Sequence, residues 1–252
     1  MSGPARVWIT GASSGIGRAV ALRYARDGAV VAASARSQAA LEKLAAEPVA
    51  AGRIKPYPVD VTDRASMVEQ VARIEQEIGL IDLAILNAGT HRPVDAAQFD
   101  PAVFDALIAV NLTGTVNGLN AVMPRMIARR GGHIAIVASV AGYAGLPTAA
   151  AYGATKAALI NMAEALKFDL DRLGVRLSLV NPGFVRTPLT DQNPFRMPAL
   201  MAVDDAADAL VRGLAGPGFE VTFPRRFTYA LKLIRLLPYR LYFPLLARST
   251  GK

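Results

Sequence analysis

The chain contains no cysteine and only two histidines, and these scarcities exclude several kinds of chemistry. Without cysteine there is no disulfide, no thiol nucleophile and no sulfur-ligated metal. The two histidines, His91 and His133, are too few for a histidine-rich metal site and have no evident partners in the sequence. We therefore predict no bound metal and structural roles for both. The lack of cysteine also suits a reducing compartment.

Long apolar runs are absent as well. No stretch of about 18 apolar residues occurs, so no membrane-spanning helix is predicted. The N-terminus lacks the apolar core of a signal peptide and leads directly into an apparent strand. We therefore expect a cytoplasmic protein.

Positive charge is concentrated at one end of the chain. The net charge is +8 over 252 residues. Residues 224–252 hold seven of the 28 basic residues and none of the 20 acidic ones, so the remaining body is nearly neutral. The charge is a property of this tail, and it does not predict nucleic-acid binding by the body.

Apolar strands alternate with amphipathic helices from the first residues onward. Strands are predicted at 5–10, 29–35, 53–61, 82–89, 133–139 and 175–183, and helices at 13–28, 37–47, 64–79, 101–129 and 152–174. This order is typical of an α/β protein with a parallel sheet that is covered on both faces. We predict a doubly wound, Rossmann-type sheet as one domain over residues 1–223, followed by a basic amphipathic extension over 224–252.

A glycine-rich turn joins the first strand to the first helix. Gly11, Gly15 and Gly17 allow the backbone to turn tightly and to approach a pyrophosphate at the helix N-terminus. Their spacing is wider than that of the usual dinucleotide-binding motif. Three glycines could form only a turn, but their place at this junction favours phosphate binding.

The end of the second strand discriminates between dinucleotides. An acid at this position would hydrogen-bond the adenosine ribose of NAD, whereas an arginine accommodates the 2′-phosphate of NADP. Here the segment carries Arg36 and no acid. We predict NADP(H); the alternative is that Arg36 is only a solvated charge at a helix start.

Four polar residues suggest acid–base chemistry. Tyr152 and Lys156 lie four apart on a predicted helix and so share a face. A nearby ammonium lowers the pKa of a phenol and makes it a useful proton donor or acceptor. Ser139 ends the fifth predicted strand, and Asn111 lies within a long helix, where it implies either a kink with bound water or a core hydrogen bond. Alone, a tyrosine–lysine pair is a weak signal.

Taken together, the motifs resemble those of the classical short-chain dehydrogenase/reductase family over about residues 5–215. The matching elements are TGASSGIG (10–17), Asp60, NAG (87–89), Asn111, Ser139, YGATK (152–156), NPG (181–183) and Thr187. The Tyr-x-x-x-Lys spacing differs from the enoyl-reductase subgroup. The chain also lacks the large C-terminal domain of the sugar-nucleotide epimerases.

The resemblance implies roles for these residues. Tyr152 would be the general acid/base, Lys156 would bind the nicotinamide ribose and lower the tyrosine pKa, Ser139 would polarise a carbonyl, and Asn111 would support a water-linked proton relay. The positions expected to contact the cofactor are Gly11, Ser13, Ser14, Gly15, Ile16, Gly17, Arg36, Asp60, Val61, Asn87, Ala88, Gly89, Tyr152, Lys156, Pro182, Gly183 and Thr187.

The segment after Thr187 would form a lid in this family. Its apolar residues predict an apolar pocket, or else only pack the lid: Leu189, Phe195, Met197, Leu200 and Met201.

The tail combines apolar and basic residues at helical spacing. Phe227, Leu231 and Ile234 fall on one face, and Tyr239 to Leu246 form a dense apolar and aromatic run. Such a composition is typical of a helix in a membrane interface. Pro238 and Pro244 should break it into short pieces. The alternatives are an oligomer contact or a cover over the substrate cleft.

These features predict an NADP(H)-dependent oxidoreductase that interconverts a ketone and a secondary alcohol. We expect an apolar or lipid-like small-molecule substrate, no metal, no nucleic acid, peripheral contact with the inner face of a membrane, and a homodimer or homotetramer. The alternative from another class is a non-catalytic nucleotide-binding regulator or membrane-tethered scaffold.

Overall fold

The computed structural model describes residues 3–50, 52–192 and 197–250 and contains one seven-stranded parallel sheet. The strand order is β3-β2-β1-β4-β5-β6-β7. The strands are β1 (Arg6–Thr10), β2 (Val30–Ser34), β3 (Ile54–Pro56), β4 (Leu83–Leu86), β5 (His133–Val137), β6 (Arg176–Pro182) and β7 (Glu220–Phe223). Every pairing between neighbouring strands is parallel. The predicted fold class, a doubly wound parallel sheet flanked by helices, is confirmed.

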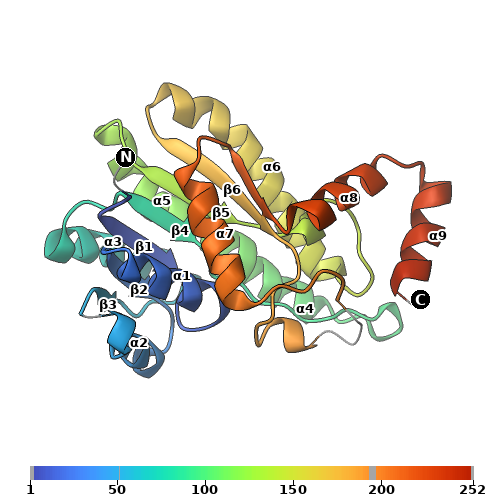
Figure 1. Ribbon diagram of the computed structural model, residues 1–252, viewed down its shortest axis with the longest axis horizontal. Coiled ribbons are helices and arrows are strands. Elements are labelled where there is room, and N and C mark those ends of the chain that lie inside the picture. Colours follow the sequence, from blue (N-terminus) through green and yellow to red (C-terminus); the bar gives the residue numbers. More distant parts are fainter. Residues whose placement is uncertain (1–2, 51, 193–196, 251–252) are drawn as a thin grey trace.

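Helices cover both faces of the sheet (Figure 1). On one face lie α1 (Gly15–Arg26), α2 (Gln38–Ala45) and α7 (Val203–Ala215); on the other lie α3 (Arg64–Ile78), α5 (Gly114–Ala128) and α6 (Ala150–Arg172). The described chain also has α4 (Pro101–Leu107), a π-helical turn η3 (Ile108–Thr113), and 3-10 turns η1 (Pro48–Ala50), η2 (Ala96–Gln98), η4 (Val140–Gly142) and η5 (Thr190–Gln192). The buried apolar side chains form two cores, one on each face.

The direction of winding changes between β1 and β4. The chain moves outward from β1 through β2 to β3 on one side, and from β4 to β7 on the other. In open α/β sheets, ligands bind at the carboxyl ends of the strands beside this switch point. The segments that follow β1, β4, β5 and β6 should therefore hold the functional groups.

Two predicted features differ from the structure. The third strand was predicted over 53–61, but the strand itself spans only Ile54–Pro56. Beyond it, the Tyr57 and Val59 N–H groups still donate to the Ala33 and Ala35 carbonyls (2.8 and 3.0 Å), and Pro56 and Pro58 fit between these donors because β3 is an edge strand. The seventh strand and α7, at 203–223, were not predicted. They complete the sheet beyond β6 and belong to the same core as α1.

The long helix predicted at 101–129 is divided into α4, η3 and α5. By length and mean hydropathy, 1.3, residues Pro101–Ala128 could cross a membrane. In the structure this helix packs against α3, α6 and strands β4 and β5, which is the position of a core helix.

The tail forms two helices, α8 (Arg225–Arg235) and α9 (Tyr239–Thr250), which extend from the body at one end of the molecule (Figure 1). Pro238 lies between them, as predicted. The predicted break at Pro244 is wrong, because α9 continues through this residue on its exposed side. The helix there lacks one backbone donor but stays continuous.

Candidate active site

The glycine turn has the conformation that its glycines allow. Gly11 and Gly15 have φ angles of 68° and 53°, a region that favours glycine. Ser14 precedes α1 in extended conformation, and its side chain does not cap the helix. The first N–H groups of α1 are therefore directed to the space beside the turn, where an anionic group fits.

The turn is fixed against the NAG segment that follows β4. The Thr10 hydroxyl accepts hydrogen bonds from the backbone N–H groups of Asn87 (3.0 Å) and Ala88 (3.1 Å). A Cβ atom at Gly17 would lie 2.3 Å from the Gly11 carbonyl oxygen and 2.5 Å from Asn87 Nδ2. Only glycine fits at position 17, so the glycine turn and the NAG segment pack closely and expose backbone groups on a shared surface.

The outer part of this surface carries Arg36, which is exposed just after β2. No ion pair involves Arg36 within the part of the chain that the structure describes. Ser37, the next residue, caps α2 by accepting from the Ala40 N–H (3.2 Å). The side chain of Arg36 is therefore available to an anion near the glycine turn.

The remaining cofactor candidates come from the loops after β3 and β6. Asp60 is exposed and lies four residues beyond the end of β3, not at the strand end, and its Oδ1 accepts from the Thr62 N–H (2.9 Å); Val61 is buried. After β6, Thr187 reaches the glycine turn, because a Cβ at Gly15 would lie 3.3 Å from Thr187 Cγ2. Pro182 ends β6 beside β7, and the N–H of the next residue, Gly183, donates to the Phe223 carbonyl (2.7 Å).

Tyr152 lies in the first turn of α6 and faces the segment after β5. Burial raises the pKa of the Tyr152 phenol, and a hydrogen bond with the Ser139 side chain partly lowers it. Ser139 is buried, two residues beyond the end of β5, and its Oγ accepts from the Ala141 N–H (3.1 Å). These two side chains meet as predicted. The net pKa shift is upward, which is opposite to the predicted lowering by Lys156.

Lys156 lies one turn further along α6 and is almost fully buried. Its Nζ donates to the Val137 carbonyl (2.9 Å) and lies 5.6 Å from the centre of the Tyr152 ring. Burial lowers the pKa of Lys156 to about 8. The ammonium is thus held behind Tyr152, and its charge is sensitive to pH near neutrality.

Asn111 lies in the π-helical turn and is fully buried. Its Nδ2 donates to the Thr90 carbonyl (3.0 Å) and to the Thr155 hydroxyl (3.1 Å), while its Oδ1 accepts from the Thr90 N–H (2.7 Å). The structure thus favours a core hydrogen-bond role. A Cβ at Gly89 would lie 3.4 Å from Asn111 Oδ1 and 3.6 Å from Lys156 Nζ, so both side chains border the same glycine.

His91 was predicted to be structural and without a partner, but it lies beside Tyr152. Its imidazole packs edge-on against the Tyr152 ring, with centroids 4.9 Å apart. Its position two residues after the NAG segment, at the carboxyl end of β4, was the signal that could have placed it there. His133 does have a structural role: it pairs with the Ser178 hydroxyl (2.9 Å), and burial lowers its pKa to about 3.

A hollow opens in front of Tyr152 and Ser139. Most of its lining is apolar and comes from the segments after β5 and β6: Val140, Ala141, Leu146, Pro147, Ala149, Gly183, Phe184 and Leu189, with His91, Thr148 and Thr190. Of the predicted lid residues, Leu189 lines the hollow, and Met201 packs against the core instead. Phe195 lies outside the described residues.

The family is shown by comparison with known sequences. A model of the short chain dehydrogenase family matches residues 5–196. The chain belongs to this family. Its candidate Ser139, Tyr152 and Lys156 all lie within the matched part, and the 224–252 tail lies outside it.

The chain is also similar to individual proteins. An uncharacterised oxidoreductase of Myxococcus xanthus is 38% identical over 93% of both chains. A 3-oxoacyl-(acyl-carrier-protein) reductase of Thermotoga maritima is 39% identical over 74% of this chain and 76% of its own length. A solved serine dehydrogenase in complex with NADP⁺ superposes with a TM-score of 0.78 at 26% identity, covering 86% of this chain and 94% of that one. The chain is therefore an oxidoreductase of this family, with a site for a nicotinamide cofactor.

Proposed function

We propose that this oxidoreductase uses NADPH to reduce an apolar ketone to a secondary alcohol. The observation that carries the proposal is that Ser139 and Tyr152 lie side by side at the wall of an apolar hollow. The hydroxyls of both residues can point at one carbonyl oxygen in that hollow. The similarity to a 3-oxoacyl reductase, whose name denotes reduction of a ketone, supports this reaction class.

Tyr152 acts as the general acid. Because burial raises the pKa of its phenol, the hydroxyl stays protonated near neutral pH and can donate to a substrate oxygen. Ser139 accepts from the Ala141 N–H, so its own proton is free to be donated to Tyr152 or to the substrate. In reduction, Tyr152 gives its proton to the oxygen as the carbonyl becomes an alkoxide.

The glycine turn, the NAG segment and Thr187 hold the dinucleotide, with the pyrophosphate at the N-terminus of α1. When bound, the nicotinamide supplies or accepts the hydride. Lys156, beside Gly89, binds the nicotinamide ribose and returns a proton to Tyr152 after each turnover. Asn111 positions the segment around Thr90. A ribose and phosphates beside Lys156 would favour its charged form.

Arg36 selects NADP(H). The guanidinium is exposed at the end of β2, and no acid occupies that strand end. A charge-assisted hydrogen bond to the 2′-phosphate is the interaction that this position offers. The similar serine dehydrogenase was solved as a complex with NADP⁺, which agrees with this preference.

The tail attaches the enzyme to a membrane surface. The outward sides of α8 and α9 expose large apolar residues: Tyr229, Leu233, Leu236, Tyr239, Leu241, Phe243 and Leu245. The tail sequence contains seven basic and no acidic residues. Apolar insertion combined with attraction to anionic head groups describes peripheral binding, here to the inner face of a membrane.

Assembly as a homodimer or homotetramer remains our prediction. Exposed apolar side chains outside the tail, such as Val116 on α5 and Phe168 on α6, are available for a contact between copies. Light scattering coupled to size-exclusion chromatography would give the number of chains.

Initial-rate assays test the proposed reaction. NADPH or NADH oxidation is followed with a panel of apolar and polar ketones, and NADP⁺ reduction with the corresponding alcohols. We expect turnover with NADPH and apolar ketones. Tight NADPH binding without turnover of any ketone or alcohol would instead identify the alternative, a non-catalytic regulator or scaffold.

A further inference from the structure

The carboxylate of Glu220 joins three separate segments of the chain. Glu220 is the first residue of β7, and its side chain is 23% exposed. Its Oε1 accepts hydrogen bonds from the Tyr143 hydroxyl (2.6 Å) and from Asn181 Nδ2 (2.8 Å). Its Oε2 pairs with Nζ of Lys232. These partners belong to the loop after β5, to β6 and to α8, so one side chain links all three.

Two of these partners adjoin the candidate active site. Ser139 precedes the η4 turn as its N-cap, and Tyr143 follows the same turn as its C-cap. Asn181 is fully buried and directly precedes residues 182–183, which we expect to contact the cofactor. Among the described residues that line the hollow in front of Tyr152, neither Tyr143 nor Asn181 occurs. Both therefore act on the site only through the residues beside them.

The register of β6 and β7 places the polar groups of this network on one face of the sheet. Asn181 pairs with Thr222, two residues beyond Glu220, so all three side chains point the same way. Thr222 Oγ1 donates to the Asn181 carbonyl (2.9 Å). Burial alone would raise the pKa of Glu220, but hydrogen bonds from Lys232, Tyr143 and Asn181 lower it. The carboxylate stays charged, and hydrogen bonds to a charged group are stronger than neutral ones.

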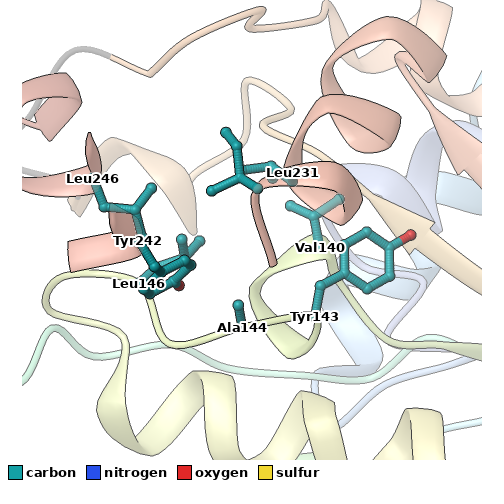
Figure 2. A pocket seen from close by; sticks show the side chains of 8 residues that line it. Val140, Tyr143, Ala144, Leu146, Leu231, Tyr242 and Leu246 are labelled. Carbon is teal, nitrogen blue, oxygen red and sulfur yellow. The ribbon is translucent and has the colours of Figure 1, made fainter. Parts of the chain in front are cut away.

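The tail contacts the same two segments at further points. On α9, the Tyr242 hydroxyl donates to the Gly145 carbonyl (2.6 Å). On α8, the Phe227 ring centre lies 5.7 Å from that of Phe184, which lines the hollow. Figure 2 shows the side chains that meet where the tail packs against the loop after β5: Val140, Tyr143, Ala144 and Leu146 from the loop, and Leu231, Tyr242 and Leu246 from the tail. Both segments that border the hollow thus contact the tail, and Glu220 is the polar link between them.

We propose that Glu220 is a positioning residue of the active site. Through Tyr143 it holds the turn that begins at Ser139, and through Asn181 it holds the segment that follows β6. Together these bonds fix where the Ser139 hydroxyl lies relative to Tyr152. A displacement of about 1 Å at a reacting group costs up to about a hundredfold in rate. The inference rests on the proposed ketone reduction and adds a residue on which its geometry depends.

Steady-state kinetics of the full chain test this role, with NADPH and the ketone of highest turnover. Tyr143→Phe keeps the ring but removes the bond to Glu220, and Glu220→Ala removes all three bonds. Each should lower kcat about tenfold. Tyr143→Phe should leave the KM for NADPH within about twofold of the wild type. Glu220→Gln keeps an acceptor for Tyr143 and should recover most of the kcat lost in Glu220→Ala.

The double variant Tyr143→Phe/Glu220→Ala tests whether the two residues act as one unit. It should be no slower than Glu220→Ala alone, because Tyr143 acts through that carboxylate. Losses that multiply in the double variant would overturn the proposal. A kcat within about twofold of the wild type in both single variants would overturn it as well.

A matched network at the opposite edge of the sheet provides the controls. Tyr57, just after β3, donates to Glu77 Oε2 (2.9 Å), and Glu77 also pairs with Arg73. Tyr57→Phe and Glu77→Ala remove the same kinds of bond and should leave kcat within about twofold of the wild type. Thermal unfolding measures the stability that each variant loses. Control losses of kcat as large as those of Tyr143→Phe and Glu220→Ala would indicate general destabilisation and overturn positioning.

Hydrogen exchange separates the positioning role from the reaction, because it requires no turnover. In Glu220→Ala, the amides of residues 140–146 and 183–187 should exchange about tenfold faster than in the wild type, whereas Glu77→Ala should leave them unchanged. If the wild type reduces no ketone, this faster exchange would still support the role of Glu220 in holding both segments. Wild-type exchange rates in both segments of Glu220→Ala would overturn it, whether or not ketones are reduced.

Discussion

The imidazole of His91 packs edge-on against the phenol ring of Tyr152, with ring centroids 4.9 Å apart and ring planes inclined by 67°. Both residues line the hollow in front of Ser139. One ring approaches from the segment after β4 and the other from the first turn of α6, so the contact joins two segments that are far apart in the sequence. We infer that the imidazole of His91 holds the phenol ring of Tyr152 in position and does not itself contact the substrate.

Replacing His91 tests the positioning role. An aromatic pair of this geometry contributes about 0.5–1.5 kcal/mol, so His91→Ala should lower kcat about two- to tenfold, with NADPH affinity unchanged. His91→Phe keeps a ring and should recover most of the activity. A loss beyond about a hundredfold in both variants would contradict positioning and would indicate that the imidazole itself transfers a proton.

Arg36→Ala should weaken NADPH binding and leave NADH binding unchanged. The lost charge-assisted hydrogen bond predicts an increase of about 10- to 100-fold in the KM for NADPH. Steady-state kinetics with both cofactors measure the effect. Lys43→Ala, which removes an exposed charge from the neighbouring helix α2, is the control. Equal losses with NADPH and NADH would show that Arg36 does not contact the 2′-phosphate.

Lys156 should make the stability of the cofactor-free protein depend on pH. Burial lowers its pKa from 10.5 to about 8, so between these values the unfolded state binds more protons than the folded state. The stability contribution of Lys156 is therefore unfavourable below pH 8 and becomes less so as the pH rises.

Urea unfolding of the wild type and Lys156→Met measures this effect. From about pH 7.5 to about pH 9.5, the free energy of unfolding of the wild type should rise relative to that of the variant by about 2 kcal/mol. The comparison cancels the titration of the other groups. A constant difference across this range would mean that the ammonium is not destabilised by burial.

The tail should bind vesicles that contain anionic lipid more strongly than neutral ones, and added salt should weaken the binding. Leu233→Ser, Leu236→Ser and Phe243→Ser combined remove apolar area from the exposed side and should reduce co-sedimentation about tenfold. Phe168→Ser, an exposed aromatic on α6, is the matched control. Equal binding by the triple variant and the wild type would contradict membrane attachment. Truncation after residue 223 is less informative, because it also removes the Tyr242 contact with Gly145.

Most of the sheet could be predicted from the sequence, because buried parallel strands are nearly continuous apolar runs. The six predicted strands are all present. β7 was not predicted; it follows a segment that the family resemblance marked as a lid. The π-helical turn at Asn111 could not be predicted either, since its amino acids suit an α-helix equally well.

Within the site, the sequence placed residues on elements but could not place side chains against one another. The pairing of Ser139 with Tyr152 followed from family order and is present. The upward shift of the Tyr152 pKa was not foreseeable, because the depth of burial depends on the loops after β5 and β6. The contact of His91 with Tyr152 was missed for the same reason, because nothing in the sequence around a single histidine indicates which distant residue it packs against.

The tail shows a related limit. Helical spacing correctly grouped Phe227, Leu231 and Ile234 on one side, but a sequence pattern does not state what that side contacts. In the structure Leu231 and Ile234 lie opposite Val140 and Leu146 of the loop after Ser139. The contact with the rest of the chain depends on Lys232, Tyr143 and Glu220, which lie far apart in the sequence.

The most direct test of the account is NADPH-dependent ketone reduction by Tyr152→Phe, with NADPH binding measured in parallel by fluorescence titration. This variant keeps the aromatic ring against His91 and removes the hydroxyl that donates the proton. The account predicts NADPH affinity within about twofold of the wild type and a loss of turnover of at least about a hundredfold. Turnover equal to that of the wild type would contradict the account.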